Sequence, residues 1–429
     1  METIQYPGVR ETLYRETMEN GLEVYVLPKE GFQKTYATFS TRYGSVDNHF
    51  AVAGSGPIRV PDGIAHFLEH KMFEEPEGDI FATFASQGAS ANAFTSFDRT
   101  VYLFSATENI PDNIATLVNF VQNPYFTDEN VNKEKGIIEQ EINMYKDNPD
   151  WRVYFGLIAA MYHVHPVHID IAGTVESIYR IDKETLYRCY ETFYHPSNMM
   201  LFVVGGVQPD EVMKLVRDNQ AGKSFPEQGA INRIFDEEPT AVRQARLTTN
   251  LPVSLPKVMF GFKEKTVPNT VEQLLRREVT TKLMLEALIG PSSELYQSLY
   301  DDNLISDGFG NEYNSSMQYA FSVLGGDTRD PDELLRRIRA SVDATLEKGL
   351  NAESFERTKR KRLGGYLRML NSPESIANEF TRYRFRGGDL FELLELYETI
   401  SLDEANARLR EHFDWNQMAV SIVANKGQA

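Results

Sequence analysis

Two histidines stand four residues apart in the stretch GIAHFLEHKMFE, residues 63–74 of a chain that has only eight histidines. On an α-helix, residues i and i+4 lie on one face, so the imidazoles of His66 and His70 can reach one ion. Glu69 lies in the same turn, where it can act as a general base rather than as a ligand. The order H-x-x-E-H is the reverse of the commoner H-E-x-x-H zinc motif. The stretch therefore predicts part of a zinc site, although an exposed polar face with two incidental histidines would have the same pattern.

A short helix must carry these residues. Asp62 is predicted to be its N-cap, and helical spacing runs from Ile64 to Phe73. A zinc ion that does chemistry takes three protein ligands and keeps one position open. A third ligand must therefore come from elsewhere in the chain.

The third ligand is sought in a long predicted helix, KEKGIIEQEINMYKDN, residues 133–148. Glu134, Ile138 and Glu141 share one stripe of this helix, whereas Glu139 points elsewhere. Carboxylates on a core-facing stripe repel each other and are costly to bury, so Glu134 and Glu141 would be stabilised by a nearby cation. Glu141 as the ligand, with Glu134 behind it, meets that need. A solvated acidic face balanced by neighbouring lysines is the alternative, and spacing does not tell which helices face each other.

Three further histidines, His163, His165 and His168, stand close together in MYHVHPVHID. Pro166 breaks the strand alternation there, and no glutamate lies among them to act as a base. A loop with hydrogen-bonded or exposed histidines is therefore favoured over a competing metal cluster. His195 precedes a proline and a predicted strand, and it is interpreted as structural.

The composition excludes several classes of function. The formal net charge is −18, so nucleic acid and an anionic membrane surface are repelled over most of the surface. The single cysteine, Cys189, permits no intrachain disulfide and is expected to be a buried filler. No 18 apolar residues run together, and residues 1–21 lack an apolar signal segment. We therefore expect a cytoplasmic protein without nucleic-acid or membrane partners.

The elements that must position the site alternate between strand and helix in the first half of the chain. Strand period occurs in LEVYVLP, TYATFSTRYGS and TVYLFSA, and helix period in PDNIATLVNFVQN. The polar stretch 226–245, which is broken by proline, is the predicted linker between a domain at 1–225 and a domain at 246–429. The helix-then-strand segment DKETLYRCYETFYHPSNMMLFVVGG has a shorter echo in SLDEANARLREHFDWNQMAVSIVAN near the C-terminus. Two related α+β halves are therefore expected.

The chain resembles the insulinase/pitrilysin family of zinc metallopeptidases, and more closely its YmfH-like bacterial branch of processing-protease-like members. The resemblance rests, in family order, on DGIAHFLEHKMFE, GASANAFTSFDRTVYLFSA, KEKGIIEQEINMYKDNP, HPVHIDIAGTVESI and YHPSNMMLFVVGG. It implies two homologous α+β domains, each a mainly antiparallel sheet with helices packed on one face, that enclose a chamber. Only the first of these domains carries the zinc motif.

The resemblance also implies roles for individual residues. One zinc ion would be bound by His66, His70 and Glu141, with Glu69 as the general base and Glu134 supporting the site from outside the ligand set. The implied function is a zinc-dependent endopeptidase that hydrolyses extended peptides or small unfolded segments inside the closed chamber.

The stretch SANAFTS, residues 90–96, resembles the family's edge strand beside the metal. Asn92, Ala93 and Phe94 would then be available to a peptide substrate, which can add to an open sheet edge as an extra strand. An internal strand with small residues for packing is the alternative.

One stretch departs from the family pattern. Active members commonly carry an Arg and a Tyr seven residues apart that grip the substrate backbone, whereas SSELYQSLYDDNLISD has Tyr300 and Asp307 at those places. Either a homologous partner subunit or a second copy of this chain supplies the pair, or the chain is a catalytically weak or noncatalytic structural subunit of a peptidase-like heterodimer. We favour the partner, because a chain that never cleaved would have no use for clustered ligand carboxylates.

Overall fold

The computed structural model describes residues 1–76 and 78–426, which form two compact units. Unit 1 contains Met1–Ile142, Asp170–Phe235 and Arg368–Phe385, and unit 2 contains Asn143–Ile169, Asp236–Leu367 and the chain from Arg386 onward. Each unit therefore combines segments from both halves of the sequence. The chain passes from unit 1 to unit 2 at Phe235, inside the stretch predicted to be a linker.

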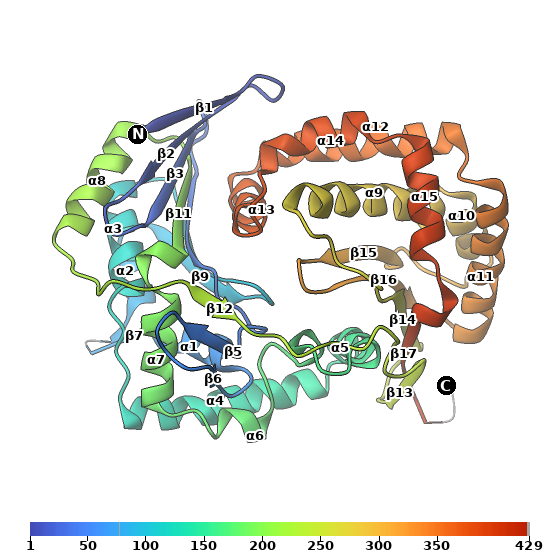
Figure 1. Cartoon of the computed structure of the whole chain (residues 1–429), viewed down its shortest axis with the longest axis horizontal. Helices are drawn as coiled ribbons and strands as arrows, with labels where there is room; N and C mark the ends of the chain where they lie inside the picture. The colour runs from blue at the N-terminus through green and yellow to red at the C-terminus, as the bar shows by residue number, and fades with distance from the viewer. Residues whose placement is uncertain (77, 427–429) are drawn as a thin grey trace. The chain divides into compact units, whose positions relative to one another are not determined.

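Unit 1 is built on a seven-stranded sheet with the order β1-β2-β3-β11-β4-β10-β9 (Figure 1). Neighbouring strands are antiparallel except β3 and β11, which are parallel. β4 and β11 are buried along their whole length, because both faces of the sheet are covered there. The strands are β1 (Glu2–Tyr6), β2 (Glu11–Thr17), β3 (Glu23–Pro28), β4 (Thr35–Thr41), β9 (Ala89–Thr95), β10 (Thr100–Ala106) and β11 (Met199–Gly205).

Helices of the first half cover one face of this sheet, and a helix of the second half covers the other. Tyr102 of β10 packs against Phe120 of α3 on the first face. On the opposite face, Phe202 of β11 stacks on Phe380 of α13, and in Figure 1 α13 lies across the sheet from α3 and α8. The helices named here or below are α1 (Ile64–Met72), α2 (Ile80–Ser86), α3 (Ile110–Val121), α4 (Asp128–Lys146), α7 (Lys183–Phe193), α8 (Pro209–Ala221) and α13 (Pro373–Phe385).

Unit 2 contains a five-stranded sheet with the order β13-β17-β14-β16-β15. Only β13 and β17 are parallel, and the other neighbours are antiparallel. The series β3-β11-β4-β10-β9 of unit 1 has the same order and the same directions, which is the topology expected of a duplicated α+β fold. The strands are β13 (Arg246–Asn250), β14 (Lys257–Phe262), β15 (Gly310–Ser315), β16 (Ala320–Asp327) and β17 (Met418–Ala424).

The two units have exchanged equivalent helices. α5 (Pro149–Met161) follows the long helix α4 in sequence but packs on β13, β14 and β17 of unit 2. α13 follows the long helix α12 (Ala352–Met369) and packs on β4 and β11 of unit 1. Gly156 permits the close approach of α5, since a Cβ there would lie 2.6 Å from the hydroxyl oxygen of Ser421. The remaining helices of unit 2 include α9 (Val271–Ile289), α10 (Glu294–Asp301), α11 (Pro331–Lys348) and α15 (Leu402–His412).

The segments identified as echoes of each other form matching elements. α7 leads into β11, and α15 leads into β17. The predicted linker is not wholly irregular, because Ile231–Arg233 form β12, which pairs with β5 (His49–Val52). Cys189 on α7 is free and buried, as expected. Within the described residues, no helix combines the length and the apolar character that crossing a bilayer requires.

Candidate metal centre

The helix that carries the histidine pair begins differently from the prediction. Its N-cap is Gly63, with φ 86°, and not Asp62. The prediction was wrong because the Asp62 carboxylate accepts a hydrogen bond from Asn48 Nδ2 at 2.6 Å instead of capping the helix. A Cβ at Gly63 would lie 2.3 Å from the carbonyl oxygen of Ala172, so the chain at this turn requires glycine.

α1 and α4 bring together the two histidines and one glutamate. Ligand atoms of His66, His70 and Glu141 all lie within 4.8 Å of one another, and they form the sole such group of three or more among the described His, Cys, Asp and Glu residues. His66 Nε2 lies 3.7 Å from Glu141 Oε1, and His70 Nε2 lies 3.5 Å from Glu141 Oε2. The same atoms that would bind a metal therefore face one another.

This donor set fits zinc. Imidazole nitrogen and carboxylate oxygen bind zinc at about 2.0 to 2.2 Å, and two ligand atoms on a tetrahedral ion are therefore about 3.4 Å apart. The distances of 3.5 and 3.7 Å are close to that separation, so His66, His70 and Glu141 can bind one ion after small movements. Two imidazoles and a carboxylate also leave the fourth position open, as catalytic zinc sites do.

Glu134 and Glu139, the other two glutamates considered on α4, point in the different directions that helix geometry predicts. Glu134 is buried, and its Oε1 lies 3.0 Å from His70 Nδ1. This contact leaves His70 Nε2 to face Glu141, because a hydrogen bond at one ring nitrogen sets the role of the other. Glu139 points away and accepts a hydrogen bond from the Tyr179 hydroxyl at 2.5 Å.

The two imidazoles differ in protonation. Burial, with a smaller effect from the neighbouring His70, lowers the pKa of His66 to about 3. Burial also opposes the charged form of His70, but the hydrogen bond to Glu134 and the nearby carboxylates outweigh it and raise the pKa of His70. His66 is therefore a ready neutral ligand, whereas a metal must compete with a proton at His70. Nδ1 of His66 is buried without a hydrogen-bond partner in the described structure, unlike Nδ1 of His70.

Glu69 is held apart from the three ligand residues. Its side chain is mostly buried, and its Oε2 accepts a hydrogen bond from the Thr95 hydroxyl at 2.7 Å. Burial raises the pKa of Glu69, although the hydrogen bonds from the Thr95 side chain and backbone oppose the rise. A carboxyl group with a raised pKa beside a metal site is suited to accept and return a proton.

Two residues of the site were not foreseen from the sequence. Thr95 belongs to the stretch predicted to bind peptide, but it contacts Glu69. Lys71 has no exposed side-chain surface; it forms an ion pair with Glu74 and lies 3.9 Å from Glu134 Oε2. The position of Lys71 directly after the second histidine could have drawn attention to it. Buried lysines are rare without a carboxylate partner, so a lysine at that position would have implied such a partner.

The stretch predicted to bind peptide forms β9, which is at the edge of the seven-stranded sheet. Asn92 is exposed, whereas Ala93 and Phe94 are half-buried. The Ala93 N–H donates to Asn92 Oδ1 at 2.9 Å and is therefore not used in pairing with β10. Antiparallel strands direct alternate residues toward the neighbouring strand, so the backbone of Ala93 faces the open edge and that of Phe94 faces β10.

The other histidine cluster lies in unit 2 and forms hydrogen bonds. Glu238 accepts bonds from the backbone N–H groups of His163, Val164 and His165, each at 2.8 Å. His168 Nδ1 lies 2.6 Å from the carbonyl oxygen of His165. In unit 1, His195 Nδ1 lies 2.8 Å from the Ser197 hydroxyl. These histidines shape loops and do not converge on a common point.

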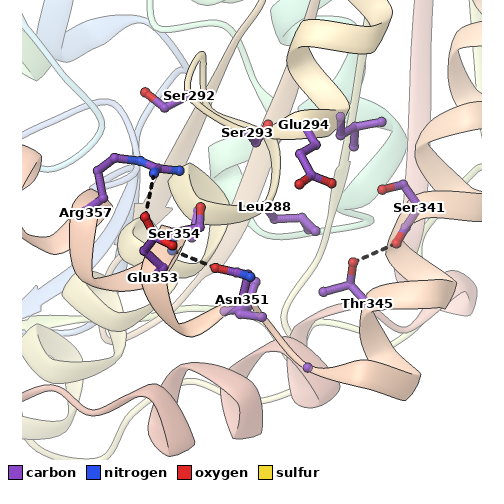
Figure 2. A pocket seen from close by; sticks show the side chains of 14 residues that line it. Leu288, Ser292, Ser293, Glu294, Ser341, Thr345, Asn351, Glu353, Ser354 and Arg357 are labelled. Atoms are coloured by element: carbon purple, nitrogen blue, oxygen red, sulfur yellow. Dashed lines mark hydrogen bonds and ion pairs between the residues drawn. The ribbon is translucent and has the colours of Figure 1, made fainter.

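Tyr300 and Asp307, the residues at the places of the expected Arg and Tyr, are both exposed in unit 2. A pocket of about 390 Å³ lies at the start of α10, the helix that carries Tyr300 (Figure 2). The Arg357 guanidinium on its wall is 3.9 Å from the Glu353 carboxylate. The pocket's cation and one of its two acids thus pair with each other, and none of the predicted site residues lines it.

Sequence comparisons identify the family to which the chain is related. Residues 60–175 match the family model described as "Insulinase (Peptidase family M16)", and residues 180–362 match "Peptidase M16 inactive domain". The "Uncharacterized zinc protease YmfH" of Bacillus subtilis is 49% identical over 427 residues, which are 99% of this chain and 100% of that protein.

Structural comparisons give the same result. The crystal structure of a putative M16-like peptidase from Alicyclobacillus acidocaldarius has a TM-score of 0.94 and 43% identity, with 96% of this chain and 98% of that chain covered. A protease from Helicobacter pylori shares the fold, with a TM-score of 0.81, 20% identity and coverage of 96% and 99%. The chain belongs to the insulinase family of peptidases, family M16.

Proposed function

We propose that the protein is a zinc-dependent endopeptidase that hydrolyses extended peptides or small unfolded segments within a closed chamber. The observation that carries this proposal is the convergence of His66, His70 and Glu141 while Glu69 stands beside them outside the ligand set. A solvated acidic face on a helix would not place two imidazoles, each able to be neutral, against one carboxylate in a largely buried position.

His66, His70 and Glu141 would hold the ion, and Glu134 would orient His70. A bound zinc ion would polarise the scissile carbonyl and make water a stronger nucleophile. Glu69 takes the proton from the attacking water and passes it to the leaving amine, which regenerates the carboxylate. Its raised pKa favours the uptake of the proton from water, and the leaving amine, which is a stronger base than a carboxylate, then takes the proton from Glu69.

The open edge of β9 supports an extended peptide as the substrate. A peptide carbonyl would replace Asn92 Oδ1 as the acceptor for the Ala93 N–H, and the freed Asn92 amide and the Phe94 ring would contact side chains. Backbone pairing of this kind depends little on side-chain identity, so we expect broad sequence tolerance.

We further propose a homologous partner subunit, or a second copy of this chain, that supplies the Arg and Tyr missing at Tyr300 and Asp307. A noncatalytic structural subunit of a peptidase-like heterodimer is the second candidate, and the same two residues favour it. The proposal includes the cytoplasmic location expected from the sequence, which cell fractionation tests.

The decisive experiment measures zinc content and the cleavage of a quenched peptide library by the purified chain, alone and with co-purified homologous subunits. We expect about one zinc per chain, loss of cleavage on chelation and recovery on adding zinc. Glu69→Gln should bind zinc normally and lose roughly 10²- to 10⁴-fold in rate, the usual range for a general base. Equal cleavage by Glu69→Gln would refute the mechanism.

A second variant separates the two candidates. Tyr300→Arg combined with Asp307→Tyr restores the expected pair within one chain, so it should raise the rate of the isolated protein if a partner normally provides these groups. A zinc-loaded protein that stays inactive with this double substitution, and with every homologous subunit, would instead be the structural subunit.

A further inference from the structure

Thr95 connects the open-edge strand to the proposed base. It is the last residue of β9, and its hydroxyl donates to Glu69 Oε2 at 2.7 Å. The hydroxyl oxygen of Thr100 lies farther away, at 3.4 Å, and Thr100 donates its own hydrogen to the Tyr43 carbonyl at 2.9 Å. A threonine has one hydroxyl hydrogen, and here Glu69 receives it.

This contact fixes the orientation of the carboxylate. Oε2 of Glu69 accepts the hydrogen bond from the Thr95 hydroxyl, and the Thr95 backbone also favours the charged form of this carboxylate. A glutamate side chain has three rotatable bonds, so a base that must present one oxygen to a water molecule needs the other to be held. Thr95 supplies that restraint from outside α1.

The same strand places the base relative to the peptide. The backbone N–H groups of Ala93 and Thr95 both face away from β10, because alternate residues of an antiparallel strand face its neighbour, and the Ala93 N–H donates to Asn92 Oδ1 instead. The intervening Phe94 points its backbone toward β10, and so does Ser96, whose N–H donates to the Arg99 carbonyl at 2.8 Å. A peptide that pairs with Ala93 is therefore aligned by the strand that also holds Glu69.

We propose that Thr95 is a positioning residue: its hydroxyl holds Glu69 against the edge strand, so that the base is aligned with a peptide paired to that strand. This inference rests on the proposed peptidase function. It assigns Thr95 no contact with the metal ligands, and it predicts an effect on turnover rather than on zinc or peptide binding.

The test compares Thr95→Val, which keeps the shape and removes the hydroxyl, with Thr95→Ser, which keeps the hydroxyl. Both are assayed in the form of the protein in which the parent cleaves. Thr95→Val should lower kcat about 10-fold to 100-fold, as expected for a misplaced catalytic group, and change KM less than 3-fold. Thr95→Ser should stay within about 3-fold of the parent.

Two further measurements do not depend on turnover. Zinc affinity, from competition with a chelating dye, should be the same in both variants and the parent. In the metal-free protein, Thr95→Val should lower the unfolding temperature more in the parent than in the Glu69→Met background, because only the parent has the acceptor.

The outcomes separate this inference from the proposed function. A parent without chelator-sensitive cleavage means that the proposed function has failed. An active parent with unchanged kcat in Thr95→Val, equal losses in the serine and valine variants, zinc affinity that falls with activity, or additive shifts in unfolding temperature overturns the role of Thr95 alone.

Discussion

Zinc binding should weaken at acidic pH with the slope of a single proton. The pKa of His66 is about 3, so this imidazole stays neutral above pH 5, whereas the pKa of His70 is raised above its ordinary 6.5. A proton on His70 reduces the apparent zinc affinity by the factor 1 + 10^(pKa − pH). With 6.5 as the lower limit for this pKa, affinity should fall at least about tenfold between pH 7.5 and pH 5.5.

Glu134→Gln tests the cause of this pH dependence. The substitution removes the charged partner of His70 Nδ1, so the pKa of His70 should fall and the pH dependence should move to lower pH. Zinc affinity at pH 7.5 should also fall, by about 10-fold to 100-fold, as is typical when the hydrogen-bond partner of a metal ligand is lost. Glu139→Gln is the matched control, because Glu139 lies on the same helix and contacts Tyr179 instead.

The assay is competition between the metal-free protein and a chelating dye whose zinc affinity is known at each pH. A slope of two protons between pH 7 and pH 5.5 would show that both histidines titrate there, and the assignment of a neutral His66 would be wrong. An affinity independent of pH, or equal losses in Glu134→Gln and Glu139→Gln, would refute the role of Glu134.

Three further predictions concern stability. Gly63→Ala should lower the unfolding free energy by at least about 2 kcal/mol, because φ is 86° and the new Cβ would meet the Ala172 carbonyl; a loss below 1 kcal/mol in urea titration would contradict this. Leu157→Ala on α5 removes a fully buried side chain and should cost about 2 to 5 kcal/mol, whereas an unchanged urea midpoint would mean that α5 adds little to unit 2. Acid should destabilise unit 2 through Glu264: burial alone would raise its pKa, but His412 and two arginines outweigh burial and hold it at about 2. The Glu264 carboxylate of the unfolded chain binds a proton more readily than that of the folded chain. The low pKa therefore contributes about 3 kcal/mol to the free energy of unfolding above pH 5, and this contribution is lost as the pH falls toward 2. Glu264→Gln should flatten this part of the dependence of stability on pH.

The local parts of the site could be predicted from the sequence. His66 and His70 share a helix face because of helix geometry alone, and the same rule separated Glu141 from Glu139 on α4. The approach of α4 to α1 could not be derived in this way, because it depends on how the two helices pack on the rest of unit 1. The resemblance to a known family supplied that information.

The features that sequence reasoning missed depend on contacts between distant residues. Asp62 is of a residue type that is favoured at helix N-caps, but its carboxylate accepts a hydrogen bond from Asn48 instead. Thr95 looks like any strand threonine until β9 lies beside α1. The sequence of α5 does not show which sheet covers this helix.

The exchanged helices limit how the chain can be divided. If the backbone were cut between residues 235 and 236, the N-terminal fragment would carry α5, whose apolar face belongs to the sheet of the other fragment, and it would lack α13 over its own sheet. Neither fragment produced separately would have a complete hydrophobic core. The two fragments of a nicked molecule should therefore stay associated until they are denatured. During synthesis, the sheet of unit 1 can be covered on both faces only after residues near 385 have left the ribosome.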